Sequence, residues 1–190
     1  MLIAIAASAA PPVHARGANT QLAPPPARIH VAVAICDAER VAPAILDKAT
    51  RIVDAVYADI GVDIEWTDEC GGGASALEVH LVAHDPADGT VSNVTMGFAE
   101  SGTSAATILY DRVDHFARRY HIKREVLLGY GIAHELGHLL LPPNSHSPAG
   151  VMRSNLDLQL ASAKRLRFTS EQAASILERL EASPAAIGTR

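Results

Sequence analysis

Aromatic side chains, cysteine and positive charge are all scarce in this 190-residue sequence. With only 4% aromatic residues, the core must consist mainly of valine, leucine, isoleucine and alanine. A net charge of −5 provides no basic surface for nucleic acid, so that class of partner is not expected. The two cysteines suit a structural role better than a catalytic one, and no Ser-His-Asp or Cys-His arrangement is evident.

A long apolar run is also missing. Residues 1–15 form a short apolar stretch that ends in Val13-x-Ala15, which favours a cleavable secretory signal and is far too short to cross a bilayer. No basic segment precedes the stretch, so a disordered apolar N-terminus on a cytosolic protein is the alternative. Residues 16–27 include three consecutive prolines and indicate a linker. We therefore expect a secreted or periplasmic protein without a membrane span.

The rest of the chain, roughly 160 residues, is long enough for one domain with a substantial core. Hydrophobic residues make up 48% of the sequence and charged residues 19%, as in globular proteins. We assign this single domain to residues 28–183 and expect it to be a monomer.

Hydrophobic periodicity predicts an α+β fold for this domain. Alternating apolar residues predict β-strands at residues 28–35, 62–66, 76–82, 95–100 and 105–110. Residues 41–60 have an apolar stripe at helical spacing and end at Gly61, which predicts a long helix. Thr169 and Gln172 form a capping-box pattern at the start of a final helix. The charged segment 111–124 indicates an exposed helix or loop face.

The motif His134-Glu135-Leu136-Gly137-His138 lies in a segment that also has helical patterning. Residues at positions i and i+4 project from one face of a helix, where two imidazoles can bind a single Zn²⁺. Glu135 lies between them, where a glutamate normally accepts a proton from zinc-bound water and so generates the nucleophile. This combination is typical of metal-assisted peptide hydrolysis.

The neighbouring residues decide between this interpretation and ordinary core histidines. Leucine, isoleucine and valine surround the motif, so its helix should be buried. Two histidines and a glutamate cost several kcal/mol in such a core unless they are paired or ligated. A metal site is therefore favoured over hydrogen-bonded core histidines.

A catalytic zinc site typically has three protein ligands and leaves the fourth position for water. His146 is the obvious third ligand, because Pro142 and Pro143 end the helix before it. A little further on, Gly150-Val151-Met152 offers a tight turn that carries a methionine. His80 and His84 lie too far apart along a strand to favour a second metal site. Tyr130 is expected to pack in the core.

These residues resemble the metzincins, zinc endopeptidases with the pattern H-E-x-x-H-x-x-G-x-x-H followed by a methionine turn. The resemblance covers residues 27–180 and is closest to matrixin-like members and to bacterial secreted proteins ending in H-S-P-x-G-[IV]-M. The sequence departs from the pattern in two places, since Leu141 stands at the glycine position and Asn144 at the third histidine. His146 follows two residues later, so the loop is two residues longer.

The resemblance implies a fold and an activity. The fold would be a twisted mixed sheet of about five strands, with a long first helix and a zinc-binding active-site helix. An N-terminal subdomain would extend to about residue 141, and a small C-terminal subdomain, 142–183, would hold the methionine turn and the last helix. His134, His138 and His146 would bind one Zn²⁺, Glu135 would be the base, and Met152 would be the turn methionine.

The resemblance also places the substrate-binding edge strand at 95–100, which includes Met96, Gly97 and Phe98. The implied function is a secreted zinc endopeptidase with protein or peptide substrates. The alternative is a non-catalytic binding protein on the same scaffold, with zinc retained for folding alone. An intact Glu135 favours the enzyme.

The two cysteines are predicted to form a disulfide. Cys36 and Cys70 each follow the end of a predicted strand, and parallel neighbouring strands would bring those ends to one edge of the sheet. A disulfide agrees with the predicted export.

Overall fold

The computed structural model describes residues 28–71, 77–84, 95–99 and 103–182. The predicted signal segment and linker, residues 1–27, lie outside this part of the chain. The described strands are β1 (Ile29–Asp37), β2 (Val62–Thr67), β3 (Leu77–Val82), β4 (Gly97–Ala99) and β5 (Ala105–Leu109). The helices are α1 (Pro43–Ala58), α2 (Tyr110–Tyr120), α3 (Arg124–Leu140), α4 (Leu158–Ser162) and α5 (Ser170–Ala182).

The five strands form one mixed sheet in the order β2-β1-β3-β5-β4. Strand β1 pairs in parallel with both β2 and β3, β3 pairs in parallel with β5, and β4 alone runs antiparallel. The predicted α+β class with a five-stranded sheet is therefore confirmed. Strand β4 lies at the edge of the sheet beside β5, so one side of its backbone has no strand partner among the described residues.

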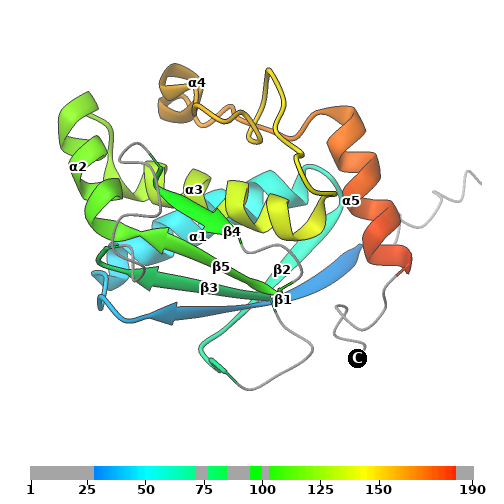
Figure 1. Ribbon diagram of the computed structural model, residues 1–190, viewed down its shortest axis with the longest axis horizontal. Coiled ribbons are helices and arrows are strands. Elements are labelled where there is room, and N and C mark those ends of the chain that lie inside the picture. The colour runs from blue at the N-terminus through cyan, green and yellow to red at the C-terminus, as the bar shows by residue number, and fades with distance from the viewer. Residues whose placement is uncertain (1–27, 72–76, 85–94, 100–102, 183–190) are drawn as a thin grey trace, which may run out of the picture.

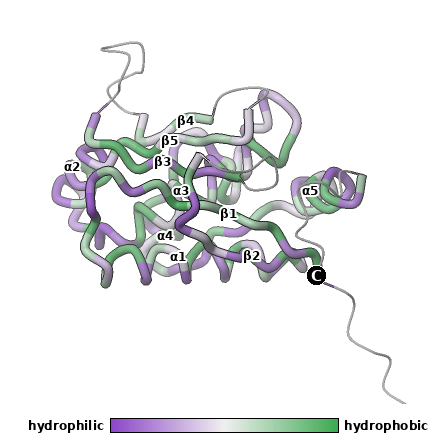
Figure 2. Tube along the Cα trace, turned by 90° about the horizontal axis from the view of Figure 1, so that it is seen from below, coloured by the Kyte–Doolittle hydropathy of each residue, from purple (hydrophilic) through white to green (hydrophobic). Residues whose placement is uncertain are grey.

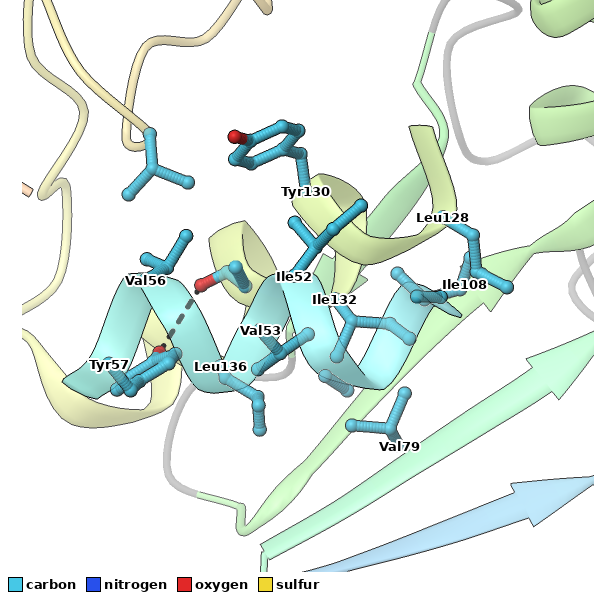
Figure 3. Close-up of a cluster of buried hydrophobic side chains, with 14 of the residues drawn as sticks. Ile52, Val53, Val56, Tyr57, Val79, Ile108, Leu128, Tyr130, Ile132 and Leu136 are labelled. Atoms are coloured by element: carbon cyan, nitrogen blue, oxygen red, sulfur yellow. Dashed lines mark hydrogen bonds between the residues drawn. The ribbon is translucent and has the colours of Figure 1, made fainter. Parts of the chain in front are cut away.

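Helices α1 and α3 pack together on one face of the sheet (Figure 1). Hydrophobic and hydrophilic residues alternate along α1, as expected for a helix with one buried side (Figure 2). Its inner face includes Ile52 and Val56, which lie against α3 in the core (Figure 3). The hydroxyl of Tyr57 donates a hydrogen bond of 3.2 Å to the carbonyl oxygen of Ala133 on α3. This bond gives a fully buried hydroxyl a partner and fixes α3 one residue before its first histidine.

The helices also cross closely, because a Cβ atom at Gly129 of α3 would lie 2.7 Å from the Ala49 carbonyl oxygen of α1. Only glycine permits that approach.

Helix α2 lies in a segment for which the sequence predicted either a helix or a loop. The predicted exposed helix or loop at 111–124 is a helix from Tyr110 to Tyr120, and its inner side buries Val113 and Ala117. Asp114 forms ion pairs with Arg118 and with Arg124 at the start of α3, both at 2.6 Å. Charged residues that look uniformly solvated in the sequence therefore join α2 to α3.

The fourth strand is shorter than predicted. Residues 95–100 were expected to be extended, whereas β4 contains only Gly97–Ala99, and residue 100 lies outside the described residues. The predicted capping box at the start of α5 is present: Thr169 Oγ accepts from the Gln172 N–H at 3.3 Å, and Gln172 Oε1 accepts from the Thr169 N–H at 3.0 Å. None of the described helices combines the length and apolar character that a membrane span requires.

Candidate metal centre

Helix α3 presents two imidazoles to solvent from an otherwise buried segment. His134 and His138 are half-buried, while most of the residues around them are inaccessible. The helix is apolar on nearly all sides because it lies between α1, the sheet and the C-terminal segment. It ends at Leu140, and Pro142 and Pro143 follow after the C-cap residue Leu141. A rigid, packed helix therefore fixes the spacing of the two rings.

The loop after α3 brings the ring of His146 next to the rings of His134 and His138. The Nε2 atom of His138 lies 3.0 Å from Nε2 of His134 and 3.1 Å from Nε2 of His146. One ring nitrogen from each of the three histidines lies within 4.8 Å of the others. Three nitrogens bound tetrahedrally at zinc distances would be roughly 3.3 Å apart. The observed spacing is close to that geometry.

Asn144, at the standard position of the third histidine, lines the same cleft as the three histidines. It has φ = 62°, the left-handed conformation that asparagine tolerates better than most residues. Asn144 therefore has a role in turning the chain, and the two extra residues bring His146 into place.

Hydrogen bonds orient the histidine rings. Nδ1 of His134 lies 2.8 Å from the carbonyl oxygen of Val151, which can only accept, so Nδ1 donates and Nε2 carries a lone pair. Nδ1 of His138 lies 3.1 Å from Oγ of Ser145. Such outer hydrogen bonds are typical of metal-binding histidines. A cation between the three rings would neutralise the repulsion between converging lone pairs, so the donor set fits Zn²⁺.

The protonation states agree with this fit. Burial, reinforced by the nearby His134 and His146 rings, lowers the pKa of His138 to about 4. Burial also lowers the pKa of His134, although the bond to Val151 partly opposes this shift. Both rings are therefore neutral at pH 7, which is the form that binds metals.

Glu135 lies between these rings in sequence and faces the same cleft. It is only 6% exposed, and burial raises the pKa of its carboxyl group to about 8. A divalent cation next to it would favour the ionised form and lower that pKa. The carboxyl group has no hydrogen-bond partner among the described residues, so its oxygens are available to a molecule in the cleft.

The cleft has a volume of about 890 Å³ and extends from α2 past the histidines to the C-terminal segment. Met96, Gly97 and Phe98 line one side, which places the predicted edge strand beside Glu135. A Cβ atom at Gly97 would lie 3.0 Å from Cγ of Glu135 and 2.8 Å from the Thr107 carbonyl oxygen. Glycine therefore allows the edge strand to approach the acid this closely.

Met152 lies against α3 in a buried turn. A Cβ atom at Gly137, within the histidine motif, would be 2.4 Å from Sδ of Met152. The turn contains Gly150, with φ = 79°, and is held by a 3.0 Å bond from the Ser147 N–H to the Met152 carbonyl oxygen. The predicted methionine turn is thus in contact with the predicted ligand helix.

Other predicted residues have structural surroundings. The predicted disulfide between Cys36 and Cys70 is present, with their Cα atoms 5.7 Å apart, although Cys36 lies within the last residues of β1 and not after its end. Cys36 also lies near Glu78 and His80, but its sulfur is in the disulfide and is not free to bind a metal. His84 is not part of that group. Tyr130 is buried as expected, although it also borders the cleft.

Several residues that line the cleft were not predicted from the sequence. Arg153 and Arg179 reach it from the methionine turn and from α5, and Phe116 and Tyr120 reach it from α2. The position of Arg153 directly after Met152 was the only available signal. The others come to the cleft through tertiary packing, which no local pattern reveals.

Comparisons with known proteins show which solved structures have a similar fold. No protein-family model matches the chain, and no curated protein matches it. Among solved structures, a zinc-dependent peptidase from Methanocorpusculum labreanum aligns with a TM-score of 0.54 and 13% identity, over 76% of this chain and 99% of that one. An archaemetzincin from Methanopyrus kandleri aligns with a TM-score of 0.50 and 16% identity, over 84% of this chain and 99% of that one. At these identities the likeness shows a shared fold.

Proposed function

We propose that the protein is a zinc-dependent endopeptidase in which His134, His138 and His146 bind one Zn²⁺. The observation that carries this proposal is the convergence of three imidazole nitrogens beside Glu135, at the base of an open cleft. The two solved structures compared above are described as a zinc-dependent peptidase and an archaemetzincin, which supports the choice of metal. Their low identity leaves the matrixin-like resemblance as a prediction.

When bound, Zn²⁺ would supply Lewis-acid chemistry, acidifying water and polarising a substrate carbonyl. Glu135 would act as general base and accept a proton at its carboxylate from the attacking water. Its burial suits this role, because a carboxylate in a low-dielectric site is a stronger base than one in water. The protonated carboxyl group could then return the proton to the leaving amine.

The edge strand would hold the substrate. β4 is the edge strand of the sheet that the described residues form, so the backbone groups on its outer side can pair with an extended peptide. Because Gly97 lies against Glu135, a peptide paired along β4 would pass directly over the base. The C-terminal segment with Met152 would form the opposite wall and support the ligand helix from below.

We further propose that the protein is exported after cleavage near residue 15. The disulfide between Cys36 and Cys70 supports this location, because such bonds persist mainly outside the reducing cytosol. N-terminal sequencing of the mature protein should begin near Arg16. Material that still begins with Met1 would contradict export by this route.

The activity is tested with unstructured casein. The mature chain loaded with one equivalent of zinc should cleave it, a chelator should stop cleavage, and added zinc should restore it. Circular dichroism checks that the chelator leaves the fold intact. A folded, zinc-loaded protein that cleaves nothing would instead support the non-catalytic binding protein.

A further inference from the structure

The charges in the cleft are unbalanced, even though the whole chain has a net charge of −5. Among the described residues that line the cleft, three acidic or basic side chains other than histidine are present: Glu135, Arg153 and Arg179. Glu135 is buried next to the histidines, where a bound cation would compensate its charge. Both arginines are exposed to the cleft, so its outer part is positive.

Arg153 is held close to the metal ligands. It follows Met152 in the turn, and Val151, two residues before it, accepts the hydrogen bond from Nδ1 of His134 at 2.8 Å. Two residues of extended chain span at most about 7 Å. The guanidinium therefore extends from a backbone that is fixed next to the reaction centre.

Within the described part of the chain, the Arg153 guanidinium has only one weak ion-pair partner. Its ion pair with Asp157 has an Nη1–Oδ2 distance of 3.6 Å, and the two side chains are 44% and 31% exposed. That distance is too long for a hydrogen bond, and such exposed pairs are weak. Oδ1 of Asp157 meanwhile accepts from the backbone N–H groups of Gln159 and Leu160 at the start of α4. Asp157 thus competes only weakly for the arginine and leaves its N–H donors available.

We infer that the cleft selects substrates with an acidic side chain close to the scissile bond, and that the Arg153 guanidinium binds that carboxylate. A guanidinium can donate two parallel hydrogen bonds to a carboxylate, which is a stronger interaction than the long pair with Asp157. Arg179, on the last turn of α5, adds positive potential to the same cleft and has no ion pair among the described residues. This inference deepens the proposed function, because it names the substrate class of the proposed peptidase.

The test uses peptides that differ only in charge. A casein-derived peptide is made with Glu, Gln or Lys at each of three positions on either side of the cleaved bond. At one position the zinc-loaded wild-type protein should cleave the Glu peptide about tenfold faster than the Gln peptide, as kcat/KM, since charged hydrogen bonds outweigh neutral ones. The Lys peptide should be the slowest. Added salt should reduce the preference.

Variants assign the effect to one side chain. Arg153→Ala should lose the difference between Glu and Gln, and Arg153→Glu should invert it in favour of Lys. Asp157→Asn should strengthen the preference for Glu, because asparagine can still cap α4 but no longer competes for the guanidinium. Arg165→Glu is the matched control, since it changes the charge by the same amount outside the cleft and should leave the preference unaltered. A preference for Glu that persists in Arg153→Glu would overturn the assignment.

A binding assay separates this inference from the proposed activity. Zinc-loaded Glu135→Gln protein is titrated with the same intact peptides, and it should bind the Glu peptide more tightly than the Gln peptide. Selective binding without cleavage in the wild type would contradict the peptidase and support the acidic subsite. Cleavage or binding that is equal for Glu and Gln at every position would overturn the subsite and leave the peptidase standing.

Discussion

Substituting Gly137 by alanine should disturb both the fold and the metal site. A Cβ atom at this position would lie 2.4 Å from Sδ and 3.2 Å from Cε of Met152, and 3.3 Å from Cε1 of Phe168. Met152 is fully buried, so its sulfur would have to move by about 1 Å into packed surroundings to restore an ordinary contact. The movement would displace the turn whose Val151 carbonyl holds His134.

The magnitude follows from a comparison with Gly131, which lies in the same helix. A Cβ atom at Gly131 would meet only Cδ1 of Ile108, at 3.8 Å, which is an ordinary contact. Gly131→Ala should therefore show the helix-propensity gain of roughly 1 kcal/mol without a clash. Gly137→Ala should have the same helix-propensity gain. The difference in the free energy of unfolding between the two variants is therefore the overpacking cost alone, about 1 to 3 kcal/mol. For a domain of this size, that difference corresponds to about 2 to 12 °C in Tm.

The assay is urea or thermal unfolding of both variants without metal, followed by zinc titration. Gly137→Ala should be less stable than Gly131→Ala by the stated difference and should bind zinc about tenfold more weakly than wild type, as expected when an outer hydrogen bond is displaced. If both variants were equally stable and bound zinc equally well, the contact between the methionine turn and the ligand helix would have no energetic role.

Three further predictions concern individual side chains. His146→Ala should abolish tight zinc binding, whereas Asn144→Ala should retain it, as metal analysis after dialysis would show; the opposite pattern would reassign the third ligand. Gly97→Ala should raise KM or stop turnover at unchanged zinc content, because the added methyl group meets Glu135 Cγ and the Thr107 carbonyl oxygen; normal peptide kinetics would contradict a role for the edge strand. In the metal-free protein, burial raises the pKa of Glu135 from 4.5 to about 8, so its contribution to stability is present below pH 4.5 and is lost as the pH rises through 8. Glu135→Gln should therefore gain stability relative to wild type across that interval in urea unfolding, and a constant difference would refute the shift.

Local patterns were sufficient for the parts of the molecule that depend on local chemistry. The alternation in β1 and the helical spacing in α1 follow directly from which residues are apolar, and the disulfide follows from where two strands end. His146 was predicted as the third ligand because imidazole suits zinc better than the amide of Asn144 does, and its ring lies with those of His134 and His138. Each of these inferences needs only a few neighbouring residues.

The remaining features depend on contacts between distant segments. Val113 and Ala117 are two small apolar residues in a charged stretch, and only their packing shows that α2 has a buried side. Glycine is needed at position 97 because Glu135 of α3 lies against it, and at position 137 because Met152 of the methionine turn lies against it. Arg153 and Arg179 are 26 residues apart in sequence, and the return of the chain through α4 and α5 brings both to the cleft.

The most direct test of the central claim is the turnover of zinc-loaded Glu135→Gln protein. Glutamine preserves the shape of the side chain but cannot accept the proton from water. The variant should bind one zinc per chain and keep its fold, and its kcat should fall by about 10² to 10⁴. Wild-type turnover in a variant with full zinc content would show that Glu135 is not the base and would contradict the mechanism proposed for this site.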